Sequence, residues 1–169
     1  MLLTLLLLSS LALANADDEC SQTDNDYILG NYKECASSTE GNSSMRCRYL
    51  KAVCEMADSA YDKSRYELSL ISADVKSGKF DEFNGLALTS LAEIAFLQGD
   101  HKRARTLSSA VNDLLVKKLP ASYSCSVSEV LLTRSYFDAR DLAEANRKLE
   151  TMRSSKVDNM FFSSLDPWQ

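Results

Sequence analysis

The sequence predicts an all-α protein in which antiparallel helical hairpins stack in a short array of about seven helices. Apolar residues recur at helical spacing over most of the chain. No run alternates polar and apolar residues over a convincing length, as a half-buried strand would. The chain also contains only two prolines and five glycines, so few positions interrupt the helical pattern.

The segment from Leu86 to Val116 shows this pattern most clearly, as two helices joined at Gly99-Asp100. Each helix keeps one apolar face, and charged residues fall on the opposite side of the second helix. The apolar positions are Leu88, Leu91, Ala92, Ala95 and Phe96 before the turn, and Ala104, Leu107, Val111, Leu114 and Leu115 after it. A single hairpin cannot bury both of its faces, so similar hairpins are expected on either side.

The composition is typical of one globular domain, with 45% hydrophobic and 25% charged residues in a chain of 169. The formal net charge is −5. This balance argues against nucleic acid as a partner, because phosphate binding requires clustered lysine and arginine side chains. We interpret Lys102-Arg103 and Lys117-Lys118 as solvated helix surface.

Residues 1–16 have the form of a secretory signal peptide. Met1 to Leu13 is uncharged and rich in leucine, and Ala14-Asn15-Ala16 has the small-residue form of a cleavage site. We therefore expect cleavage after Ala16 and a secreted or periplasmic protein. The apolar run is too short to cross a bilayer as a helix, so no membrane span is expected once it is removed.

Export would make disulfide bonds the expected state of most of the five cysteines. Cys47 and Cys54 are expected on one helix about 10.5 Å apart, too far to bond to each other. Cys35 and Cys47 flank a loop between two helices, which favours a Cys35–Cys47 bond. Cys54 then has Cys20 or Cys125 as its partner, and we favour Cys20 because the N-terminal tail can move to meet it.

Three parts follow the signal peptide. Residues 17–44 form an acidic N-terminal segment with a short helix and a loop from Ser37 to Ser44. Residues 45–155 carry the helical period and form the hairpin domain. Residues 156–169 are expected to pack back on the last hairpin as a cap, because this segment contains Met160, Phe161, Phe162 and Trp168.

Sequence signals mark several helix boundaries within the hairpin domain. Ser64-x-x-Glu67, Ser126-x-x-Glu129 and Asp141-x-x-Glu144 have the form of a capping box, so each predicts the start of a helix. Pro120 is expected to end the helix that precedes it.

A short turn pattern occurs four times: a turn residue, a polar residue, an aromatic or large residue, and then charges. The four copies begin at Gly30, Gly78, Gly99 and Arg140. A turn residue lets the chain reverse, and a small residue five positions on, present in three copies, lets the second helix approach the first.

This pattern resembles the turn of the tetratricopeptide repeat. The likeness is strongest at Leu91-Ala92, Ala95, Gly99-Asp100, Ala104 and Val111, and next strongest at Tyr136, Arg140-Asp141 and Ala145. Gly99 and Arg140 are 41 residues apart, however, where the family has thirty-four. The resemblance implies a right-handed array whose first helices line a concave surface that holds a protein or peptide. The implied lining residues are Thr89, Glu93, Phe96 and Leu97, followed by Val130, Arg134 and Phe137.

The sequence offers little support for chemistry. His101 is the only histidine, and no nucleophile motif accompanies it. Cysteine and histidine spacings typical of zinc, haem or thiol redox centres are absent, and so is a phosphate-binding glycine loop. We expect no cofactor and no metal.

These observations favour an exported, non-enzymatic adaptor that binds a protein or peptide partner. Two alternatives remain open. One is a secreted or periplasmic inhibitor or immunity protein that acts on a toxin or an enzyme, and the other is an enzyme with an unrecognised site.

Overall fold

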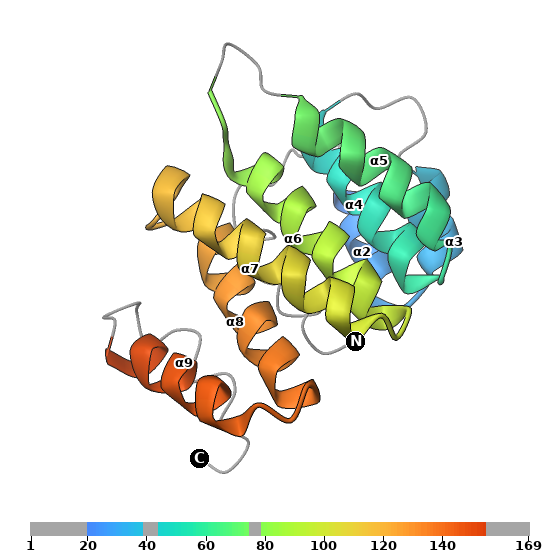
Figure 1. Ribbon diagram of the computed structural model, residues 1–169. Coiled ribbons are helices and arrows are strands. Elements are labelled where there is room, and N and C mark those ends of the chain that lie inside the picture. Colours follow the sequence, from blue (N-terminus) through green and yellow to red (C-terminus); the bar gives the residue numbers. More distant parts are fainter. Residues whose placement is uncertain (1–19, 39–43, 75–78, 155–169) are drawn as a thin grey trace, which may run out of the picture.

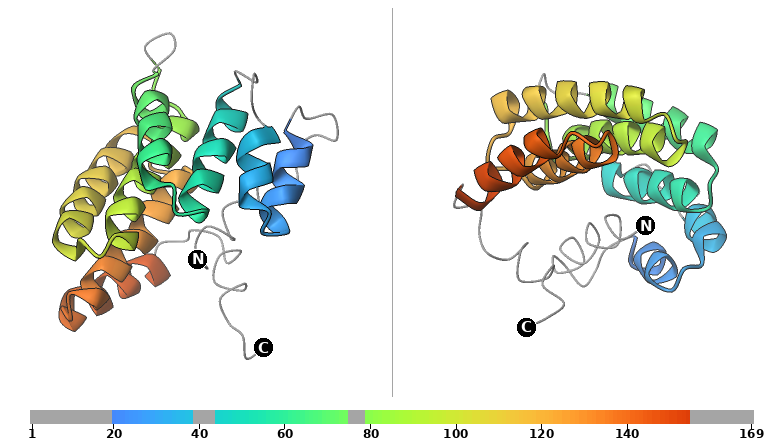
Figure 2. Two further views of the ribbon diagram at one scale, coloured as in Figure 1. Left: turned by 90° about the vertical axis from the view of Figure 1, so that its right-hand side faces the viewer. Right: turned by 60° about the horizontal axis from the view of Figure 1, so that its bottom comes forward.

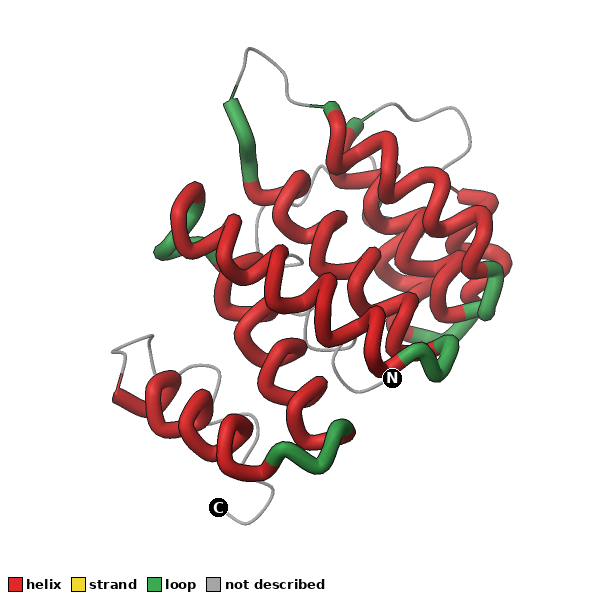
Figure 3. The backbone as a smooth tube through the Cα atoms, in the orientation of Figure 1, coloured by secondary structure: helices red, strands yellow, loops and turns green. Residues whose placement is uncertain are grey.

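The computed structural model describes residues 20–38, 44–74 and 79–154, and within these ranges every regular element is a helix, with turns and loops between the helices (Figures 1 and 3). The all-α prediction is confirmed. The helices are α2 (Ser21–Ile28), α3 (Tyr32–Ser38), α4 (Met45–Ala57), α5 (Tyr61–Ala73), α6 (Glu82–Leu97), α7 (His101–Lys118), α8 (Tyr123–Asp138) and α9 (Leu142–Ser154). The expected signal peptide and the expected C-terminal cap at 156–169 lie outside the described residues.

The helices pair as four successive hairpins, α2/α3, α4/α5, α6/α7 and α8/α9, and each helix packs against the next one along the chain. The first helices also contact one another in succession, α2 with α4, α4 with α6 and α6 with α8. No comparable contact joins the second helices in the described part of the chain. The array therefore bends into an arch, with α5 and α7 on its outer side and α4, α6 and α8 beneath them (Figure 2).

The turns inside the four hairpins share one backbone geometry. A residue in the left-handed region follows each first helix: Gly30 (φ 80°), Ser59 (φ 64°), Gly99 (φ 77°) and Arg140 (φ 58°). In each turn its amide donates to the carbonyl three residues earlier, at 2.9 to 3.1 Å, and the next amide donates to the carbonyl five residues earlier, at 2.8 to 3.0 Å. This is the Schellman motif, which satisfies the last carbonyls of a helix and reverses the chain.

Three of the four predicted turns are thus confirmed, at Gly30, Gly99 and Arg140. The fourth was expected at Gly78, which lies outside the described residues, and the residues that follow it connect two hairpins instead of closing one. The remaining hairpin turns at Ser59. Serine carries no sequence preference for a positive φ, so the pattern did not mark this position.

Two of the three predicted capping boxes are wrong, because the helices begin one turn earlier. Helix α5 starts at Tyr61, so Ser64 is buried inside it and donates to the carbonyl of Ala52. Helix α8 starts after Ser122, whose hydroxyl caps it by accepting from the amide of Cys125. Only the third position behaves as expected, since Asp141 accepts from the amide of Glu144 at the start of α9.

The largest cluster of buried apolar residues is formed mainly by α2 to α6, and close contacts then join α6 to α7 and α8. Gly85 of α6 is the tightest of them, because a Cβ atom there would lie 2.8 Å from the Cβ of Ser124 and 2.9 Å from the Cδ2 of Leu115. Glu82 accepts from the amide of Ser124 at the start of α8. Helices α6 and α8 are therefore held in direct contact at their N-terminal ends.

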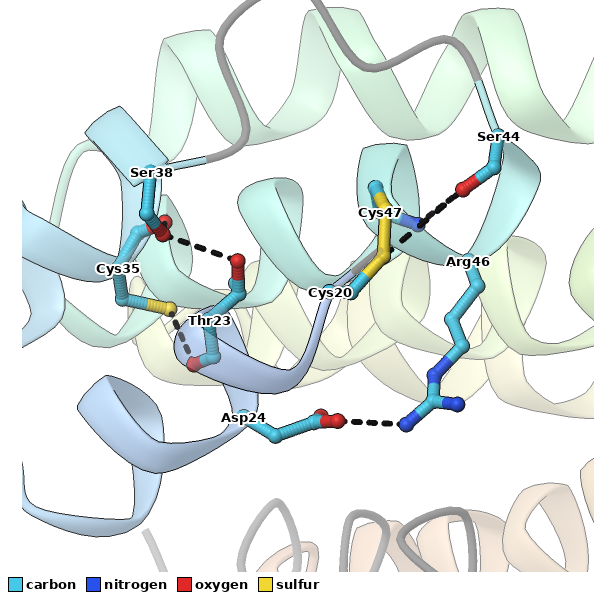
Figure 4. The surroundings of a disulfide bond; sticks show 8 residues. All are labelled: Cys20, Thr23, Asp24, Cys35, Ser38, Ser44, Arg46 and Cys47. Carbon is cyan, nitrogen blue, oxygen red and sulfur yellow. Dashed lines mark hydrogen bonds and ion pairs between the residues drawn. A yellow bond between two sulfur atoms is a disulfide. The ribbon is translucent and has the colours of Figure 1, made fainter. Parts of the chain in front are cut away.

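The structure corrects the predicted disulfide pairing. One bond joins Cys20 to Cys47, with a Cα–Cα distance of 5.6 Å (Figure 4). The other joins Cys35 to Cys54, with a Cα–Cα distance of 6.0 Å. The expected Cys35–Cys47 and Cys20–Cys54 bonds are wrong, whereas Cys47 and Cys54 do not bond to each other, as expected. Cys125 has a free, buried thiol.

The error arose from the register of α3 against α4. The prediction placed the two helices level at their connection, but Cys35 lies beside Cys54, about 10.5 Å farther along α4 than Cys47. The first turn of α4 therefore extends past the C-terminal end of α3 and does not lie beside it. The N-terminus of α2 fills the place beside Cys47, where the ion pair between Asp24 and Arg46, at 2.6 Å, also joins α2 to α4 (Figure 4).

Candidate functional site

The seven predicted lining residues come from two first helices that contact each other. Four lie on α6 and three on α8. Thr89, Glu93 and Phe96 follow one another at spacings of four and three residues, and so do Val130, Arg134 and Phe137. Each helix therefore presents its set on a single face.

Arg134 and Phe96 bring the two faces together. The guanidinium carbon of Arg134 lies 4.3 Å from the centre of the Phe96 ring, a cation–π contact between α8 and α6. The ring of His101, the first residue of α7, also packs against Phe96 in a T-shaped arrangement, with 5.3 Å between the ring centres. Phe96 and Arg134 are thus in direct contact, although nothing in the sequence indicates that these two residues meet.

Glu93 is 2% exposed and lies close enough to Arg134 for their charges to interact. Burial raises the pKa of the Glu93 carboxyl, and the positive charge of Arg134 acts in the opposite direction. The carboxyl is thus an electrostatic neighbour of the guanidinium that stacks on Phe96.

The predicted residues divide into a buried set and an exposed set. Thr89 and Phe96 are buried together with Glu93, and the hydroxyl of Thr89 donates to the carbonyl of Gly85 within its own helix. Leu97 and Phe137 are 36% and 41% exposed, and Val130 and Arg134 are half-buried. We use the name α6–α8 seam for Leu97, Val130, Arg134 and Phe137, the members that remain open to a partner.

One neighbour of this cluster was missed from the sequence. Tyr49 of α4 is buried, and its hydroxyl lies 3.1 Å from the Ser90 hydroxyl of α6. Burial raises the pKa of Tyr49, and the charge of Glu93 raises it further. The sequence contained a signal for this residue, because Tyr49, Val53 and Met56 recur at helical spacing and form an apolar stripe along α4.

The described residues hold few groups suited to catalysis or metal binding. No group of three or more histidine, cysteine, aspartate or glutamate side chains lies close enough in them to hold a metal ion. Burial raises the pKa of the free Cys125 thiol, with further contributions from Glu129 and Glu82, so the reactive thiolate is disfavoured. Among the same residues, no helix is long and apolar enough to span a membrane.

Fold and site together define an all-α array of helical hairpins with two disulfides in its N-terminal half. The two disulfides indicate an oxidising environment. No protein-family model, no curated protein and no solved structure matches the chain.

Proposed function

We propose that the chain is an exported, tetratricopeptide-like repeat protein that binds a protein or peptide partner and carries out no chemistry itself. The observation that carries this proposal is the α6–α8 seam, where half-buried Arg134 stacks on Phe96 one helical turn from exposed Phe137. Aromatic side chains and arginine are the residues that contribute most to protein interfaces.

The architecture supports the same conclusion. First helices that contact one another provide a continuous surface that a peptide can follow. The proposal also includes export through the leader at residues 1–16. The N-terminal sequence of the exported chain should then begin at Asp17.

The proposal is tested by crosslinking the exported chain to its partner in the exported fraction of its source. Phe137→Ser and Arg134→Ala are the test variants. Tyr66→Ser is the matched control, because Tyr66 is an aromatic residue of α5 that is 68% exposed and lies on another helix. Truncating a central interface residue weakens binding by about 2 kcal/mol, which is roughly thirtyfold in affinity.

We expect one partner to be crosslinked to the parent chain and to the control variant, and to be lost from both test variants. Equal recovery of the partner by all four proteins would show that the seam is not the binding surface. Recovery of no specific partner, together with turnover of a substrate by the purified chain, would overturn the proposed function.

A further inference from the structure

Arg134 has more hydrogen-bonding capacity than the structure uses. A guanidinium carries five N–H donors in a planar fork that matches a carboxylate. The Arg134 guanidinium lies over the Phe96 ring, yet it makes no hydrogen bond and no ion pair within the described part of the chain. Exposed Phe137 lies one turn away on the same helix, and exposed Leu97 follows Phe96 directly. This surface suits a segment that offers a carboxylate beside an aromatic side chain.

The chain contains such a segment outside the described residues. Residues 155–169 follow α9 and include Phe161, Phe162, Asp166 and Trp168. Asp166 supplies a carboxylate two residues before the aromatic ring of Trp168. Glu93 acts on Arg134 through its charge but accepts no hydrogen bond from it in the described part of the chain, so the segment offers the guanidinium a carboxylate to which it can donate.

The end of α9 lies near the seam. The Thr133 hydroxyl of α8 lies 3.6 Å from the sulfur of Met152 in the last turn of α9, and Thr133 directly precedes Arg134. A chain spans at most about 3.3 Å per residue, so the twelve residues from Ser154 to Asp166 can reach about 40 Å. That span greatly exceeds the distance from α9 to its neighbour α8.

We propose that residues 155–169 dock on the α6–α8 seam of their own chain, with the Asp166 carboxylate at the Arg134 guanidinium and Trp168 beside Phe137. Because the segment is tethered, its effective concentration at the seam is in the millimolar range, so even weak contacts keep it bound. A partner must displace it. This regulatory role rests on the proposed function, whereas the docking itself does not.

Trp168 is the only tryptophan of the chain, so its fluorescence reports on this segment alone. The full exported chain is compared with a synthetic peptide of residues 155–169. We expect bluer emission from the full chain, and acrylamide quenching several times weaker than that of the peptide. Arg134→Glu and Asp166→Arg should each restore peptide-like quenching, and the two together should return the parent value. Arg103→Gln, at an exposed position of α7, is the control and should leave quenching unchanged.

Far-UV circular dichroism of every variant separates loss of docking from loss of fold. Quenching equal to that of the peptide in the folded parent chain would overturn the proposal, as would failure of the charge exchange to restore protection. Protection that grows with protein concentration would also overturn it, because docking within one chain does not depend on concentration.

The partner experiment distinguishes this inference from the proposed function. If Asp166→Asn abolishes docking and increases partner crosslinking about tenfold, both proposals stand. Unchanged crosslinking by Asp166→Asn, although this substitution abolishes docking, would refute the regulatory role alone. A partner that binds the seam of a chain whose Trp168 is never protected would refute the docking and leave the proposed function in place.

Discussion

Removing the Cys20–Cys47 bond tests how strongly cross-linking stabilises the N-terminal half of the array. The bond closes a loop with a sequence separation of 27, and the Cys35–Cys54 bond closes one of 19. The loss of loop entropy in the unfolded chain corresponds to about 3.5 kcal/mol for the longer loop and about 3 kcal/mol for the shorter one. Domains of this kind are stable by about 5–15 kcal/mol in total, so either loss is a large fraction of the whole.

The paired variant Cys20→Ala/Cys47→Ala is therefore expected to lower the free energy of unfolding by about 3.5 kcal/mol, measured by urea denaturation followed by far-UV circular dichroism. Cys125→Ala removes a buried sulfur atom without removing a bond, and it serves as the control. If the paired variant loses no more stability than twice the control, the loop-entropy explanation is refuted.

The pairing itself can be read by mass spectrometry of the unreduced protein after trypsin digestion. Cleavage after Lys33, Arg46, Arg48 and Lys51 places the four bonded cysteines on four different peptides. We expect the dipeptide Cys47-Arg48 to be joined to the peptide that contains Cys20. A link from this dipeptide to the peptide that contains Cys35 would contradict the structure and restore the sequence-based pairing.

Three further predictions concern four single substitutions, two of them paired, and each is measured as the free energy of unfolding. Gly99→Ala should lower it by about 1 kcal/mol, because Gly99 has a φ of 77°, whereas Arg140→Gly should raise it by about 0.5 kcal/mol, because Arg140 occupies the same region at 58°. If Gly99→Ala raised the free energy of unfolding and Arg140→Gly lowered it, the shared turn geometry would be contradicted. Asn84→Ala should lower it by about 3 kcal/mol, since the buried Asn84 amide donates to the carbonyls of Ile71 and Asp74 and its oxygen accepts from the amide of Asp81; a loss below about 1 kcal/mol would show that these bonds contribute little. Glu93→Gln should remove part of the pH dependence. Burial raises the pKa of Glu93 above its ordinary value of 4.5, so the folded state holds a proton that the unfolded state releases, and stability falls as pH rises above about 4.5. If the free energy of unfolding changed with pH equally in the parent chain and in Glu93→Gln, this contribution would be refuted. Glu34→Gln, at an exposed position, is the control.

The hairpin architecture could be predicted because its signals are local. Periodicity marked α6 and α7, and glycine at Gly99 marked the turn between them. The turn at Ser59 was missed because serine gives no indication of a positive φ. The start of α5 was misplaced because a buried serine that bonds to the neighbouring helix looks, in sequence, like a helix cap.

The disulfide pairing could not be predicted because it depends on how far one helix slides along another. That offset is set by packing between α2, α3 and α4, which no short motif encodes. In the candidate site, too, the individual residues could be predicted but the contact between them could not. Sequence reasoning selected Phe96 and Arg134 separately, through a family resemblance, but their contact depends on the packing of α6 against α8.

The position of the two disulfides gives the array unequal ends. Both bonds lie within α2 to α4, and no disulfide reaches α5 to α9 in the described residues. A pulling force applied to the two termini would therefore peel the last hairpins away one at a time and stop at the cross-linked helices. A protease in the same compartment would meet this asymmetry too, and it would leave a resistant N-terminal fragment that retains both bonds.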